Sequence, residues 1–162
     1  MTPKKSPFEI RLESVAGPIL RATLLNRSAG PLMVLHDRNL QPSEPWLSLA
    51  GGKEIPFTDK RSIAKFDTTP YRVLYRKLDA GREMLLEEER FLPADDGASY
   101  FFLWGPFVAL GLAPGRYNAR VRWKSTLTAW VDSETRRHGN WSDIWLGEVT
   151  SNPVEIDLPE RA

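Results

Sequence analysis

Short runs of alternating apolar and polar residues extend along most of this chain. In FEIRLES, residues 8–14, Phe8, Ile10 and Leu12 alternate with charged residues. This period of two is typical of a strand with one buried face. The clearest alternation is in RYNARVRWK, residues 116–124, where every second side chain is apolar or small. The pattern therefore predicts half-buried β-strands over much of the sequence.

Glycine and proline clusters mark where these strands end. Gly51-Gly52, inside WLSLAGGKEIPF, predicts a hairpin because tight hairpin turns require positive φ angles. We expect a second hairpin from residues 71–78 and 82–92, which a short LDAG segment joins. The stretch 53–67 is the least regular, and WLGEVTSNPVEIDL, residues 145–158, predicts the end of the fold.

About eight to ten strands at this spacing, without helices long enough for parallel crossovers, predict an all-β fold. The expected architecture is a single antiparallel β-sandwich with one long loop or hairpin before the last strand. A chain of 162 residues is most naturally one domain. We expect that domain to span residues 8–158, between a flexible N-terminus at 1–7 and a short tail at 159–162.

Four segments carry a resemblance. LAPGRYNARVRW has a Pro-Gly turn and then Tyr117 two residues after the glycine. It resembles the corner before the penultimate strand of immunoglobulin-like and fibronectin-like sandwiches. NRSAGPLMV, FLPADDGASYFF and WLGEVTSNPVEI are similar to Ig-like domains of many uncharacterised bacterial proteins and some protease-associated segments. The resemblance implies an Ig-like sandwich in which Tyr117 is the structural corner, its hydroxyl bonded to the backbone.

Charge and residue usage narrow the classes of function. The chain has 22 basic and 21 acidic residues, a net charge of +1, so no overall field favours nucleic acid. It has no cysteine, which excludes disulfides, thiolate metal sites and the Cys-Trp-Cys core of antibody domains. The longest apolar stretch, residues 100–115, is broken by glycine and proline, so no membrane insertion is expected.

The N-terminus bears on the compartment. MTPKKSPFEI begins with basic residues but lacks the apolar run of a signal peptide. We therefore expect a cytoplasmic protein from the chain as it is written, and an extracytoplasmic one if a leader was removed.

Residues for catalysis or metal binding are sparse. The only histidines, His36 and His138, are far apart in the sequence, and no GxSxG or phosphate-binding glycine motif occurs. Asp95-Asp96-Gly97 is favoured as a polar turn over a calcium site. The acidic run 87–89 is favoured as a solvated strand over an acid and base pair. We expect no enzymatic activity, no cofactor and no metal.

The stretch WVDSETRRHGNW, residues 130–141, is the best candidate for recognition. It lies in a connection of about twenty residues, and connections of that length are often functional. Tryptophan and arginine are enriched at the energetic centres of interfaces. The predicted partner-binding residues are Trp130, Arg136, Arg137, His138 and Trp141. The alternative is that the indoles fold back onto the sandwich and serve packing.

A second candidate surface is the outward stripe of the strand at 116–124. Its basic side chains could receive an acidic partner, and they are Arg116, Arg120, Arg122 and Lys124. The alternative is a solvated sheet face on which these cations pair with acidic neighbours.

These observations predict a non-enzymatic protein-binding or assembly module that presents the Trp/Arg-rich loop. One alternative is a protease inhibitor or protease-associated regulatory domain, which would insert that loop, or DTTPY at residues 67–71, into an active-site cleft. A second is a carbohydrate-binding module, in which exposed indoles stack on sugar rings.

Overall fold

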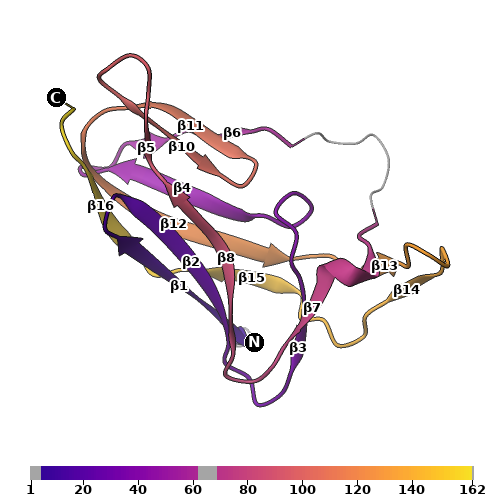
Figure 1. The fold of residues 1–162 in the computed structure, drawn as a ribbon. Coiled ribbons are helices and arrows are strands. Elements are labelled where there is room, and N and C mark those ends of the chain that lie inside the picture. The colour runs from indigo at the N-terminus through magenta and orange to yellow at the C-terminus, as the bar shows by residue number, and fades with distance from the viewer. Residues whose placement is uncertain (1–4, 62–68, 162) are drawn as a thin grey trace.

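The computed structural model describes residues 5–61 and 69–161, and it is an all-β sandwich of antiparallel sheets (Figure 1). The described residues form sixteen β segments, eight of which have five residues or more. Those eight include the alternating runs at 8–14 and 116–124 and two strands from the broken apolar stretch 100–115, and the predicted all-β sandwich is confirmed. The only helical segment described is the short 3-10 turn η1 (Arg72–Leu74).

One sheet has the strand order β1 (Phe8–Val15), β2 (Ile19–Asn26) and β8 (Glu83–Arg90). A two-stranded sheet of β3 (Leu32–Leu35) and β7 (Tyr75–Leu78) follows from it. The predicted hairpin between residues 71–78 and 82–92 is wrong, because β7 pairs with β3 while β8 pairs with β2.

Asn26 explains this departure. It is fully buried between the two pairs of strands, and its Nδ2 donates to the carbonyl oxygens of Leu78 and Gly30 at 2.8 and 2.9 Å. The main chain of Asn26 also bonds to both Gly81 and Arg82. The side chain and main chain of one residue thus hold β3 and β7 as a continuation of β2 and β8.

The opposite sheet is built on β12 (Gly115–Ser125), which pairs with β4 (Ser43–Leu49) on one edge. β15 (Gly147–Thr150) and β16 (Val154–Leu158) follow one another along the other edge of β12, so they act as one interrupted final strand. β4 turns into β5 (Glu54–Ile55) through Gly51 and Gly52, whose φ angles are +113° and +106°, which confirms the predicted hairpin.

The remaining strands form two smaller sheets. β10 (Tyr100–Trp104) and β11 (Phe107–Leu112) form a hairpin that β9 (Leu92–Pro93) and β6 (Thr58–Asp59) flank. β13 (Ala129–Val131) and β14 (His138–Asn140) pair with each other in the long connection between β12 and β15, and Val131 also forms an isolated parallel bridge with Tyr71.

The core lies between the inward faces of these sheets. Phe8 packs edge-to-face against Trp123 and Trp145, which joins β1 to the β12 sheet. Trp123 and Tyr117 are each 1% exposed, so the inward face predicted for the strand at 116–124 is confirmed. Each large aromatic side chain buries more apolar area than an aliphatic one, and this burial stabilises the domain.

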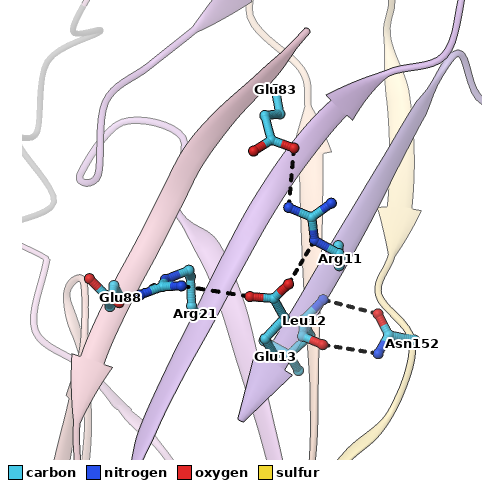
Figure 2. A network of polar contacts seen from close by, with 7 residues as sticks. All are labelled: Arg11, Leu12, Glu13, Arg21, Glu83, Glu88 and Asn152. Carbon is cyan, nitrogen blue, oxygen red and sulfur yellow. Dashed lines mark hydrogen bonds and ion pairs between the residues drawn. The ribbon is translucent and has the colours of Figure 1, made fainter. Parts of the chain in front are cut away.

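A polar contact also joins the two sheets. Asn152, between β15 and β16, accepts a hydrogen bond from the Leu12 backbone N–H and donates one to the Leu12 carbonyl, at 2.9 and 3.0 Å. Figure 2 shows this amide beside β1, next to an ion-pair network of Arg11, Glu13, Arg21, Glu83 and Glu88 on the outer face. The side chain of Asn152 therefore bonds to the open edge of β1 as a neighbouring strand would.

Candidate functional site

The candidate recognition stretch, residues 130–141, is a β-hairpin. β13 and β14 place Trp130 opposite Gly139 and Val131 opposite His138. Figure 1 shows this hairpin beside η1, at the end of the molecule away from the larger sheets. The indole of Trp130 lies against Gly139, where a Cβ would be only 2.3 Å from Trp130 Cζ2. Glycine is therefore the residue that allows this indole position.

Two indoles of the hairpin clasp a cation from η1. The guanidinium carbon of Arg72 lies 4.7 Å from the ring centroid of Trp130 and 5.2 Å from that of Trp141. The ring of Tyr75 lies 5.7 Å from Trp141, and its hydroxyl donates to the carbonyl of Ala129 at 2.7 Å. We call Arg72, Tyr75, Trp130 and Trp141 the aromatic brace. Cation–π contacts of this kind fix the hairpin to η1 and β7.

The brace determines how the predicted partner-binding residues lie. Trp130 and Trp141 are half-buried and face Arg72. Their positions fit the alternative in which the indoles serve packing better than the one in which they form a free binding surface. Arg136, Arg137 and His138 are exposed at and beside the tip. The structure thus brings all five residues into one hairpin but separates two packed indoles from three exposed cationic or polar groups.

The tip of the hairpin is held by Asp132. Its Oδ1 accepts the backbone N–H groups of Thr135 and Glu134, both at 2.9 Å, and these bonds lower the pKa of the Asp132 carboxyl. The backbone N–H of Arg136 also donates to the carbonyl of Asp132 at 3.0 Å. Arg136 has a φ of +61°, and among the described residues it is the only non-glycine with a positive φ. Such backbone strain is most common at functional sites.

The basic stripe on β12 is largely paired. Arg116 contacts Asp157 at 2.9 Å, and Arg122 contacts Glu44 at 2.6 Å and Glu148 at 3.6 Å. Lys124 lies opposite Glu148 in the strand register. These contacts match the solvated, charge-paired alternative for the stripe.

Arg120 is the exception in this stripe, because it stacks on an aromatic ring. Its guanidinium carbon lies 4.4 Å from the ring centroid of Trp46 on β4. Trp46 is 43% exposed, a large value for an indole on a central sheet face. Sequence reasoning missed Trp46, Arg72 and Tyr75. The outward position of Trp46 could have been found only from the register between β4 and β12, which no local motif encodes.

The acidic run at 87–89 divides into two environments. Glu88 is exposed and pairs with Arg21, but the expectation of a solvated residue is wrong for Glu87, which is 7% exposed. A bulge in the β2–β8 pairing sets Glu87 opposite the buried Ala22. Arg38 binds the two carboxylate oxygens of Glu87 at 2.7 and 2.8 Å. Burial and a hydrogen bond with Glu89 raise the pKa of Glu87 to about 7.

The other sequence candidates for chemistry lie in structural positions. Asp96 forms the polar turn that the sequence favours, and hydrogen bonds from Ser99 and Ala98 lower its pKa to about 2. His36 is half-buried at the end of β3, where burial lowers its pKa. Within residues 5–61 and 69–161, no cluster of three or more histidine or carboxylate side chains is placed to hold a metal ion. Residues 67 and 68 of the DTTPY segment lie outside the described residues.

The fold and the site define an all-β sandwich protein with an exposed hairpin that an aromatic brace fixes. Across the described parts of the chain, no helix has the length and apolar character needed to cross a membrane. Comparisons of the chain with protein-family models, with curated proteins and with solved structures found no match.

Proposed function

We propose that this chain is a non-enzymatic protein-binding module that presents the tip of the β13–β14 hairpin to an acidic protein surface. The observation that carries the proposal is the conformation of Arg136. This exposed residue holds a left-handed backbone conformation at a turn that has no internal need for a long cationic side chain. Glycine would adopt the same φ without strain.

Preorganisation supports the same function. Asp132 fixes the tip from within, and the brace fixes the base of the hairpin to η1. A loop that is ordered before binding loses less conformational entropy when its partner arrives. The two halves of the predicted recognition set therefore have different roles: the indoles hold the hairpin, and Arg136, Arg137 and His138 contact the partner.

The two guanidinium groups at the tip favour contact with carboxylates of a partner. Arg136 and Arg137 lie side by side, and neither forms an ion pair within the described residues. The carboxylates of Asp132 and Glu134 in the same turn balance their charge, so the two guanidinium groups would act through local contacts that orient a partner rather than through a net field. Arginine also forms planar, bidentate contacts with carboxylates, which add geometric specificity.

The Ig-like type of the sandwich is part of this proposal. Its support is the contact of Tyr117, whose hydroxyl donates to the carbonyl of Ala113, four residues upstream, at 2.6 Å. A corner tyrosine of immunoglobulin-like domains bonds to the backbone in this way. Loops at the ends of such sandwiches commonly carry recognition, although a fold of this kind hosts many functions.

The test compares two double charge reversals with the same change in net charge. Arg136→Glu with Arg137→Glu alters the tip, and Lys60→Glu with Arg82→Glu alters two exposed residues outside it. Each protein is immobilised, and proteins retained from a lysate of the source organism are identified and then measured as purified partners. We expect an acidic partner that binds the native chain and the control, and whose affinity falls at least about tenfold with the tip variant.

Equal affinity for the tip variant and the control would contradict the proposal. The protease-inhibitor alternative gives a different result, because its partner would be a protease whose activity the native chain abolishes. Trp130→Ala tests the assigned division of roles, since it removes a brace contact while Arg136 and Arg137 remain.

A further inference from the structure

The outward face of the β4–β12 sheet carries a second aromatic feature, distant in sequence from the hairpin. Trp46 lies directly opposite Arg120 in the register of the two strands, and the guanidinium covers one side of the indole. The residue as a whole is 43% exposed, so part of its surface is in contact with solvent. An indole that stays partly exposed offers an apolar surface on which another ring can stack, together with a polar N–H.

Two hollows flank the Trp46–Arg120 pair. The first has a volume of about 400 Å³ and is lined chiefly by Glu44, Glu54, Arg122 and Glu148 together with the pair. The second has a volume of about 370 Å³ and is lined by Ser48, Asn118 and Pro153 together with the pair. Each volume lies in the range of roughly 300–1,000 Å³ that is usual for small-ligand sites. Because both hollows share Trp46 and Arg120, an elongated ligand can cross from one to the other.

The polar groups around the indole include both donors and acceptors. Arg122 is held by Glu44 and Glu148, which fixes it in place. Within the described residues, Arg120 and Glu54 form no ion pair, and the side chains of Ser48 and Asn118 form no hydrogen bond. Beside one aromatic ring, Arg120 thus offers cationic donors, Glu54 an anionic acceptor, Ser48 a hydroxyl and Asn118 an amide for a ligand to bind.

This combination indicates the chemistry of the ligand. An anion in the first hollow would meet three carboxylates, and a cation would meet two guanidinium groups, so neither sign of charge is favoured there. A neutral sugar ring has an apolar C–H face that stacks on an indole and hydroxyls that both donate and accept. We propose that the Trp46 face binds a neutral oligosaccharide, with one sugar ring on Trp46 and its neighbours in the two hollows.

The site is independent of the hairpin, so the proposal goes beyond the function proposed above. We expect Trp46 to provide the stacking surface, and Arg120 and Glu54 to provide a donor and an acceptor for hydroxyl groups. Ser48 and Asn118 would serve the second hollow. An oligosaccharide bound in this way would leave the exposed tip at Arg136 and Arg137 available to a protein partner.

The test is an NMR titration of the ¹⁵N-labelled full chain, with the Trp46 indole N–H signal assigned from the spectrum of Trp46→Phe. The neutral probes are cellotetraose, maltotetraose and mannotetraose, and the charged probes are tetragalacturonate and tetralysine. We expect at least one neutral probe to shift the Trp46 and Arg120 side-chain signals in a saturable way. Trp46→Ala should weaken that association at least about tenfold, and Trp130→Ala should leave it unchanged.

Several results would overturn the proposal: no neutral probe shifts the Trp46 signal at millimolar concentration, a charged probe binds there more tightly, or Trp46→Ala binds the probe as well as the native chain. Glu54→Gln is the second variant, because Glu54 is exposed and its replacement leaves the core intact. It should weaken binding of the neutral probe without changing the melting temperature. Loss of the tip-dependent protein partner has no bearing on these outcomes, so the two proposals fail separately.

Discussion

Replacement of Asn152 tests whether its side chain is what holds the edge of β1 to the opposite sheet. The amide makes two hydrogen bonds to the backbone of Leu12, at 2.9 and 3.0 Å (Figure 2). Asn152→Ala removes both bonds while Leu12 itself stays in the core, 2% exposed. Each such bond contributes about 1 kcal/mol net, and the cost is larger where the freed groups stay dry. We therefore expect Asn152→Ala to lower the free energy of unfolding by about 2 kcal/mol.

The assay is urea denaturation at neutral pH followed by tryptophan fluorescence, together with a thermal scan. In a domain of this size, a loss of 2 kcal/mol corresponds to a fall in melting temperature of about 4–8 °C. The matched control is Asn118→Ala, because Asn118 is exposed on β12 and its side chain bonds to no described residue. We expect the control to change stability by less than about 0.5 kcal/mol.

Asn152→Asp separates the two bonds. The introduced carboxylate can accept the Leu12 N–H, but it cannot donate to the Leu12 carbonyl and is repelled by it. We expect this repulsion to outweigh the bond from the Leu12 N–H and to raise the pKa of the introduced carboxyl in the folded state. Its penalty relative to the native chain should be present at neutral pH and shrink as pH falls through that folded pKa, where an O–H donor forms. If Asn152→Ala matches the Asn118→Ala control, or the penalty of Asn152→Asp does not shrink in acid, the argument is refuted.

Two further predictions concern the hairpin and the buried carboxylate. Gly139→Ala places a Cβ 2.3 Å from Trp130 and should open the hairpin. The backbone N–H of Trp141, which bonds to the carbonyl of Thr128, should then exchange its hydrogen faster. The control is Gly30→Ala, whose added Cβ meets nothing within 4 Å and should leave this exchange unchanged. Protection unchanged by Gly139→Ala would count against the brace. Glu87 has a folded pKa of about 7 against an ordinary value of 4.5, so its folded state binds more protons and its contribution to stability falls as pH rises between these values. In Glu87→Gln this fall should be absent from urea midpoints measured across the same pH range; an identical pH profile would contradict the assignment.

Local pattern in the sequence was enough to predict the long strands. Alternation places Phe8, Ile10 and Leu12 inward, and each is 4% exposed or less. The same holds for Tyr117 and Trp123 on β12. A period of two carries this information because only one face of such a strand can reach the core. Turn residues such as Gly51-Gly52 similarly identify the β4–β5 hairpin, because the required φ angles restrict the residue type.

Strand pairing was harder to predict, because it depends on contacts distant in sequence. Residues 71–78 and 82–92 look like two arms of a hairpin, yet Asn26 and its main chain direct them to two different partners. The bulge that buries Glu87 arises from the β2–β8 register and has no marker in the acidic run itself. Both departures come from long-range register, which short motifs do not specify.

The tryptophan and arginine content of the hairpin predicted a recognition site, but the same residue types also suit packing within one chain. Tryptophan and arginine bury large areas and make cation–π contacts whether the partner is another protein or the same chain. In this chain Arg72 supplies the cation, and its position next to Trp130 and Trp141 depends on the fold.

The neighbours of each candidate residue distinguish packing within the hairpin from exposure at its tip. Trp130 faces Gly139, which has no side chain to obstruct the indole, so the indole lies on the hairpin and packs inward. Arg136 has a strained backbone, and Arg137 follows it at the exposed tip. Strain at an exposed position persists only where the surrounding structure fixes it, and here Asp132 does so with two backbone hydrogen bonds. The proposed partner contact therefore lies at the tip, with Arg136 and Arg137, while the indoles of Trp130 and Trp141 pack against Arg72.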